Sequence, residues 1–150
     1  MAAGEQITSL RAVLDDLLHC TRALHQTLIA ERDSLTEHNL NTLNAHSEEK
    51  KDLLVRLEAL EVQRRQMLNT MGFEATQEAI VPELEALWLT ILEELRHCQD
   101  ANEVNGAIVR THHTQTQRAL DLLAGRDSQT VYDADGLPAA RSRSEEIAKA

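Results

Sequence analysis

The strongest periodic pattern in the chain lies in residues 84–123, LEALWLTILEELRHCQDANEVNGAIVRTHHTQTQRALDLL. Its stripe positions alternate at spacings of three and four residues, which places them on one face of a helix. They are Leu84, Trp88, Ile91, Leu95, Cys98, Asn102, Asn105, Val109, His112, Thr116, Ala119 and Leu123. The pattern predicts one helix of about 40 residues, about 60 Å long. Pro82 suits its first turn, and Gly125 is expected to end it.

A second heptad pattern predicts a helix from about Glu5 to Leu35. Its positions follow the same alternation and are Ile7, Leu10, Leu14, Leu17, Thr21, Leu24 and Leu28. Val13 and Leu18 widen the stripe, as expected for a helix in a bundle. Because neither Pro nor Gly interrupts the pattern, we expect one continuous helix.

A third pattern predicts a helix from about Leu40 to Met71, after a polar break in which Asn39 or Asn41 would cap it. Its apolar positions are Leu43, Leu53, Leu57, Leu60, Met67 and Met71, with Leu54 and Leu68 beside them. Residues 44–52 are strongly polar. In that stretch the helix either projects beyond the core or gives way to a turn.

Three helices of unequal length joined by short breaks predict an all-α fold, an elongated antiparallel three-helix bundle or coiled coil. Gly72 is expected to end the middle helix, and Thr76 would cap a short helical turn before the last. We expect residues 1–125 to form the helical domain. Residues 126–150 have little apolar content and are predicted to form a flexible, disordered tail. An apolar face left open by the longest helix would serve a partner or a homodimer.

The composition supports this fold class. The 150 residues correspond to one domain, and the only aromatic residues are Trp88, Phe73 and Tyr132. A sheet-containing core normally uses more aromatic and β-branched residues. The two cysteines, Cys20 and Cys98, form no CxxC motif, which favours a reducing compartment.

The charge and hydropathy of the chain exclude several classes of protein. The formal net charge of −10 disfavours nucleic acid and anionic membranes as partners, since both attract basic surfaces. The first residues lack the basic and apolar regions of a signal peptide. No apolar run approaches the roughly 20 residues that span a bilayer. We therefore expect a cytoplasmic protein.

Candidate chemistry is sparse. Glu94-Leu95-Arg96-His97 is a Glu-x-x-His pattern, but di-iron bundles need two such motifs and two further glutamates. With Leu95 and Cys98 in the core, His97 would face solvent, and Cys98 would act as a small hydrophobe. No Gly-x-Ser-x-Gly motif, Gly-rich phosphate loop or compact acid–base–nucleophile cluster occurs. We expect no metal, no cofactor and no enzyme activity.

Asn102 and Asn105 are the unusual positions, because they occupy consecutive stripe positions where Leu is expected. In one interpretation they fix the register of the helices at a cost in stability. In the other they form a polar notch that hydrogen-bonds a partner helix. Gly106, a poor helix former, would allow another helix to approach closely.

Several motifs carry a family resemblance. Near the end of the chain they are Asn102-x-x-Asn105-Gly106-x-Ile108-Val109, Leu120-x-Leu122-Leu123-x-Gly125 and Tyr132-Asp133-Ala134-Asp135-Gly136. Upstream they are Glu31-x3-Leu35, Lys50/Lys51-x-x-Leu54-x-x-Leu57 and Arg64-x-x-Met67-Leu68-x3-Gly72. Together, over roughly residues 7–136, they resemble the FlgN family of flagellar export chaperones.

The resemblance implies a non-enzymatic, cytoplasmic chaperone of flagellar type III export. Family members bind the C-terminal helical regions of the hook-associated proteins FlgK and FlgL, prevent premature assembly and deliver these subunits to the export gate. Carried over, the client-binding residues would be Asn102, Asn105, Ile108, Val109, Leu120 and Leu123. Tyr132 would contact the export-gate membrane protein FlhA. The alternative function is a structural coiled-coil or adaptor protein unrelated to export.

Overall fold

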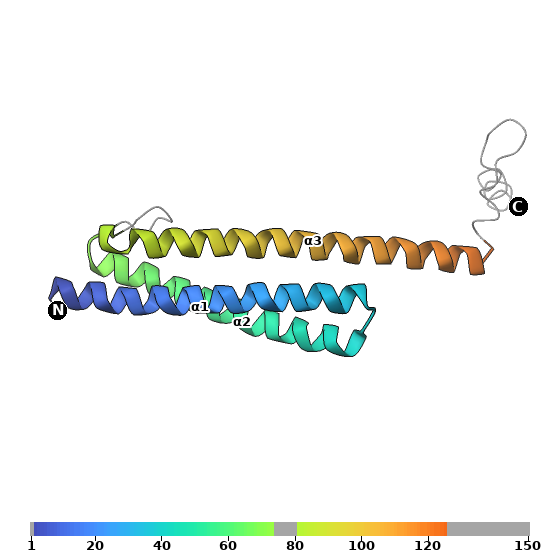
Figure 1. The fold of residues 1–150 in the computed structure, drawn as a ribbon, viewed down its shortest axis with the longest axis horizontal. Coiled ribbons are helices and arrows are strands. Elements are labelled where there is room, and N and C mark those ends of the chain that lie inside the picture. The colour runs from blue at the N-terminus through green and yellow to red at the C-terminus, as the bar shows by residue number, and fades with distance from the viewer. Residues whose placement is uncertain (1, 74–80, 126–150) are drawn as a thin grey trace, which may run out of the picture. The chain divides into compact units, whose positions relative to one another are not determined.

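The computed structural model describes residues 2–73 and 81–125. Its elements are α1 (Ala3–Thr36), α2 (Leu40–Thr70), the short 3-10 helix η1 (Pro82–Leu84) and α3 (Glu85–Leu123) (Figure 1). Among these residues there is no strand, so the predicted all-α fold with three helices is confirmed. The helix ends lie close to the predicted ones. The predictions for Thr76 and for the tail, residues 126–150, concern positions outside the described residues.

The chain divides by its internal contacts into a first unit that ends at Gly106 and a second unit that begins at Ala107. In the first unit α2 runs antiparallel to α1, and α3 runs parallel to α1 (Figure 1). Beside the α1–α2 connection, the hydroxyl oxygens of Ser34 and Thr42 form a hydrogen bond of 2.8 Å. This up-down-up order agrees with the antiparallel arrangement expected from the short connections.

The ends of α2 follow from local sequence. The Asn39 side chain accepts a hydrogen bond from the Thr42 N–H at 3.2 Å, which confirms one of the two predicted caps. At the other end Gly72 adopts a φ of 87°, where glycine is favoured, and its N–H donates to the Asn69 carbonyl at 3.1 Å. Residues 44–52 are helical throughout, so the predicted alternative of a turn there is wrong.

Helix α1 is the central element of the core. Its buried residues are Leu10, Val13, Leu14, Leu17, Cys20, Thr21, Leu24, Thr27, Leu28, Glu31, Ser34 and Leu35. By contrast, the buried residues of α2 are Leu60, Arg64 and Leu68, and those of α3 are Trp88, Ile91, Cys98, Ala101 and Asn105. A stripe as wide as that of α1 covers more than one neighbour. Both other helices therefore pack against α1.

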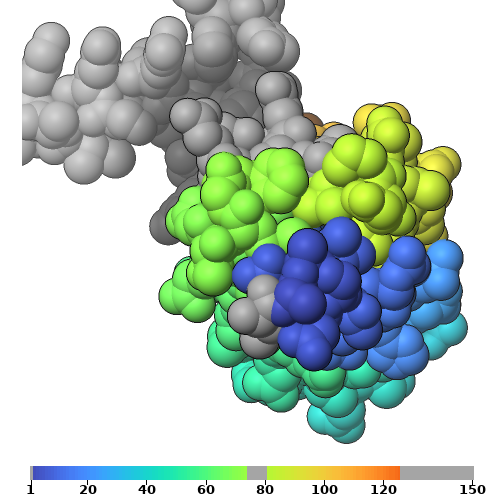
Figure 2. Space-filling view, turned by 90° about the vertical axis from the view of Figure 1, so that its left-hand side faces the viewer, coloured from blue at the N-terminus to red at the C-terminus, as the bar shows by residue number. Residues whose placement is uncertain are grey.

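The apolar core lies in two clusters along α1. Figure 2 shows the end of the first unit where the beginning of α1, the end of α2 and the beginning of α3 meet. The larger cluster includes Leu10, Leu14, Leu68, Leu84, Trp88 and Ile91. The smaller one, farther along, consists of Leu24, Leu28, Cys98 and Ala101.

In the first unit two positions of the α3 stripe depart from the pattern of a buried face. Leu95, expected in the core, is 37% exposed, and Asn102 is also exposed, whereas Ala101 is buried. The physical reason is a groove between α2 and α3 whose walls include Leu57 and Leu95. Because both helices pack on α1, the side of α3 that faces this groove stays open.

An ion pair on α2 places the buried guanidinium of Arg64 against the beginning of α3. Arg64 is 1% exposed, and its Nε and Nη2 each donate to one carboxylate oxygen of Glu61 at 2.7 Å. Its guanidinium carbon lies 4.3 Å from the centroid of the Trp88 ring, a cation–π contact. Burial raises the pKa of the Glu61 carboxyl, but the hydrogen bonds and charges of Arg64 and Arg65 outweigh it. The pKa therefore lies below its ordinary value of 4.5.

We expect Arg64→Met to lower the free energy of unfolding at pH 7 by roughly 1.5–3 kcal/mol, because hydrogen bonds to charged groups contribute on this scale. Since the folded pKa of Glu61 is lowered, the pair stabilises fully above pH 4.5. Its contribution is lost as the pH falls below that value through the folded pKa. Urea unfolding of both proteins at neutral and acidic pH measures the difference.

Arg65→Gln is the matched control, since Arg65 also contacts Glu61 but its side chain is half exposed. Its effect should stay below about 1 kcal/mol. An Arg64→Met effect that did not shrink in acid would contradict the assignment of Glu61 as the titrating partner.

Candidate functional site

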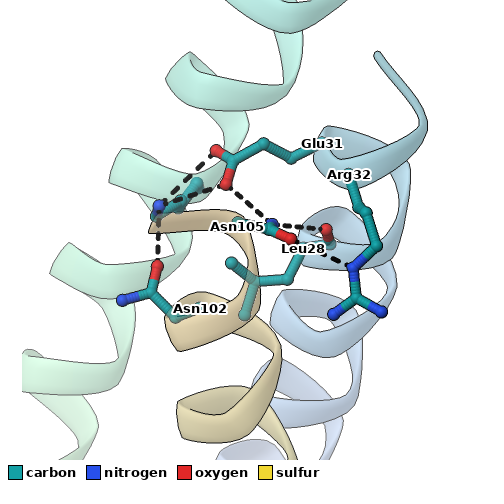
Figure 3. A network of polar contacts seen from close by, with 6 residues as sticks. Leu28, Glu31, Arg32, Asn102 and Asn105 are labelled. Carbon is teal, nitrogen blue, oxygen red and sulfur yellow. Dashed lines mark hydrogen bonds and ion pairs between the residues drawn. The ribbon is translucent and has the colours of Figure 1, made fainter. Parts of the chain in front are cut away.

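Asn105 joins α3 to α1 through every polar group of its side chain. It is 2% exposed, and its Nδ2 donates to the Leu28 carbonyl at 2.8 Å and to Glu31 Oε1 at 2.9 Å. Its Oδ1 accepts from Arg32 Nε at 3.1 Å (Figure 3). Both amide hydrogens and the carbonyl oxygen thus have partners inside the chain. This pattern supports the interpretation that Asn105 fixes the register of α3 on α1.

Glu31 and Lys50 extend this network to α2. The Glu31 carboxylate is buried on α1, and Lys50 Nζ lies 3.4 and 3.5 Å from its two oxygens. Lys50 also donates to Asn102 Oδ1 at 3.0 Å. A buried carboxylate needs such a charged partner, because an unpaired charge in the interior is costly. The two asparagines therefore differ: Asn105 lies inside the network, and Asn102 lies at its exposed edge.

The remaining predicted client residues lie on the part of α3 that belongs to the second unit. Val109, Leu120 and Leu123 are 50%, 54% and 87% exposed, and Ile108 is half-buried. Leu122, which the heptad pattern leaves out, is exposed as well. Among residues 107–125, all of which the structure describes, none is buried.

Three of the exposed apolar residues on this part of α3, Val109, Leu120 and Leu123, share a face. Val109 and Leu120 are separated by eleven positions, about three helical turns, and Leu123 follows one turn later. Thr114 lies on the opposite face. We call these three apolar residues, together with Ile108 at their edge, the apolar face of α3. Exposed apolar side chains in a row on one helix are typical of a surface that binds another protein.

The cysteine side chains are arranged as structural rather than reactive groups. Both are buried and free. Cys20 Sγ donates to the Leu53 carbonyl at 3.6 Å, and Cys98 Sγ donates to the Thr21 carbonyl at 3.4 Å. Burial, with a contribution from the charge of Glu94, raises the pKa of the Cys98 thiol to about 11. Burial also raises the pKa of Cys20, against the opposing charge of Arg56. A thiol that stays protonated is a poor nucleophile and metal ligand.

The histidines yield one arrangement that the sequence pattern misses. His97 is exposed, as predicted, and Glu94 Oε2 lies 3.9 Å from its Nδ1. His25, on α1, lies at the same distance from this oxygen. The Glu94–His97 spacing was visible in the sequence, but only the packing of α3 on α1 brings His25 beside it.

We expect Asn105→Ala to lower the free energy of unfolding by about 1–3 kcal/mol, because it removes buried hydrogen bonds to the Leu28 carbonyl and to the Glu31 carboxylate. Asn102→Ala is the matched control, and its effect should stay below about 1 kcal/mol, since water replaces an exposed hydrogen bond. Thermal or urea unfolding of both variants provides the test. Equal losses would show that the buried amide of Asn105 has no special part in the packing.

None of the helices in the described ranges is long and apolar enough to cross a membrane. The family model described as FlgN protein matches residues 1–140. Two relatives named flagella synthesis protein FlgN, from Salmonella typhimurium and Salmonella typhi, are each 30% identical over 132 residues, which covers 87% of this chain and 90% of the relative. No solved structure matches. The family match covers α1, α2 and α3 in full, and the chain belongs to the FlgN family.

Proposed function

We propose that this protein is a cytoplasmic flagellar export chaperone that binds its clients through the apolar face of α3. The clients are the C-terminal helical regions of the hook-associated proteins FlgK and FlgL. The chaperone prevents their premature assembly and delivers them to the export gate. The observation that carries the proposal is the exposed row of Val109, Leu120 and Leu123 in a chain of the FlgN family.

The apolar face supports the proposal because it is costly to expose. Removing apolar surface from water contributes about 25 cal/mol per Å², and within residues 107–125 no side chain is buried. A partner that covers this face gains that free energy without any rearrangement of the core around α1. An amphipathic client helix, with apolar residues at matching spacings, fits the requirement.

The relatives support the flagellar part of the proposal. Their name, flagella synthesis protein FlgN, associates those proteins with building the flagellum, and the similarity covers 87% of this chain. A chaperone that hides an aggregation-prone helix needs a binding surface and no chemistry. The buried, protonated thiols of Cys20 and Cys98 agree with that requirement.

Asn105 and Asn102 take different roles in this proposal. The side chain of Asn105 is fully occupied by α1, so it acts indirectly by holding α3 in register. Asn102 is exposed and shares Lys50 with Glu31, so its amide remains open to a client. Direct contact between either asparagine and a client stays a prediction.

We expect Val109→Glu and Leu123→Glu each to weaken binding to the C-terminal helix of a hook-associated protein by about tenfold or more, because each places a charge within a desolvated contact. Isothermal titration calorimetry with purified client fragments measures the change. Thermal stability should be nearly unchanged, since both side chains are at least half exposed.

Thr114→Glu is the matched control, because it adds the same charge to the opposite face of the same helix. It should leave client binding unchanged. If all three variants bound the client as the wild type does, the client surface would lie elsewhere. If the protein bound no flagellar subunit at all, the structural adaptor interpretation would replace the chaperone.

The proposed gate contact rests on Tyr132, which lies outside the described residues. Tyr is enriched at binding hot spots, and Asp133 and Asp135 beside it would speed encounter with a basic site. We expect Tyr132→Ala to keep client affinity within about twofold, while binding to the gate protein FlhA falls by about tenfold. Pull-down with the cytoplasmic part of the gate protein, alongside a client titration, separates the two. A parallel loss of client binding would place Tyr132 in the client site.

A further inference from the structure

Three side chains on the α1–α3 seam bring their metal-binding atoms together. Glu94 Oε2 lies 3.9 Å from His25 Nδ1 and 3.9 Å from His97 Nδ1. The two imidazole rings are 5.6 Å apart between centroids and tilted by 38°. One ligand atom from each residue lies within 4.8 Å of the other two. His25 comes from α1, whereas Glu94 and His97 are three positions apart on α3.

We propose that His25, Glu94 and His97 bind one divalent transition-metal ion, with Zn²⁺ the best match. Two imidazole nitrogens and one carboxylate oxygen are a common protein ligand set for Zn²⁺, completed by water in the fourth position. Bond lengths of about 2.0–2.2 Å in a tetrahedral site place neighbouring ligand atoms about 3.3–3.5 Å apart. The two distances to Glu94 are 3.9 Å, so small side-chain rotations close the site.

The surroundings leave this site open to a cation. All three side chains are partly exposed, so an ion can enter and keep a bound water. Arg22 lies 3.7 Å from Oε1 of Glu94, which is the other carboxylate oxygen, and its own side chain is mostly exposed and free to swing away. The net charge of −10 adds a general attraction for cations. The neighbouring Cys98 is excluded as a ligand, because its buried thiol donates to the Thr21 carbonyl.

A metal ion here would connect α1 directly to α3. The contacts between the two helices near this point include the ion pairs of Glu94 with Arg22 and His25, a thiol hydrogen bond, and the apolar cluster around Leu24 and Leu28. An ion held by both helices adds a link that the unfolded chain cannot form, so binding stabilises the folded state. The site is independent of the apolar face of α3, and its test does not depend on a flagellar client.

The experiment uses the full-length, untagged protein and Zn²⁺ alone. Calorimetric titration should show one equivalent of Zn²⁺ bound. At a free concentration about a hundred times the dissociation constant, Tm should rise by roughly 5–10 °C. His25→Ala and His97→Ala should each weaken binding by about 10–100-fold or more, since even indirect partners of a metal site have effects of this size.

His19→Ala and His113→Ala are the matched controls, because they remove exposed histidines from the same two helices outside the cluster. Both should bind Zn²⁺ as the wild type does. His97 is itself exposed, so His97→Ala should fold normally, which circular dichroism verifies. The proposal is overturned if the wild type shows no saturable binding, if binding survives both cluster variants, or if a control abolishes it.

Discussion

Helix α1 packs against both other helices of the first unit, and this constraint governs the rest of the structure. Its wide buried stripe contacts α2 along one edge and α3 along the other. Thr21 illustrates the requirement at the centre. It is completely buried, its hydroxyl donates to the Leu17 carbonyl on its own helix, and its carbonyl accepts the thiol of Cys98 from α3. A polar side chain is tolerated at such a buried position because its hydrogen-bonding groups have partners.

Polar contacts lie within and beyond the apolar clusters. Arg64 pairs with Glu61 and stacks on Trp88 inside the larger cluster, whereas Glu31 is held by Lys50 and Asn105 beyond the smaller one. The Glu31 contacts run between helices and so discriminate against other registers, since a shifted helix leaves the buried carboxylate unpaired. After Asn105 the character of α3 changes, because the described residues from 107 onward include no buried side chain. One helix thus contains both a core element and a stretch whose side chains are all at least partly exposed.

Sequence patterns predicted the parts of the fold that depend on local interactions. The helices follow from heptad spacing, and the ends of α2 follow from the Asn39 cap and the left-handed Gly72. What the patterns missed depends on how the helices lie against one another. The exposure of Leu95 results from the groove beside α2, and the burial of Arg64 reverses the usual expectation that charged residues face solvent. The client-binding residues stay predictions, because the contacts within one chain do not test a surface that binds another protein.

The two cysteines lie in different helix–helix interfaces, so their thiols can report on each interface separately. Cys20 lies between α1 and α2, where its thiol donates to the Leu53 carbonyl, and Cys98 lies between α3 and α1. Neither thiol can react until its own seam separates, because a buried, protonated sulfur is inaccessible to reagents. The rate of thiol modification at each position therefore reports the opening of one interface separately from the other. The chain carries a natural pair of probes that distinguish release of α2 from release of α3.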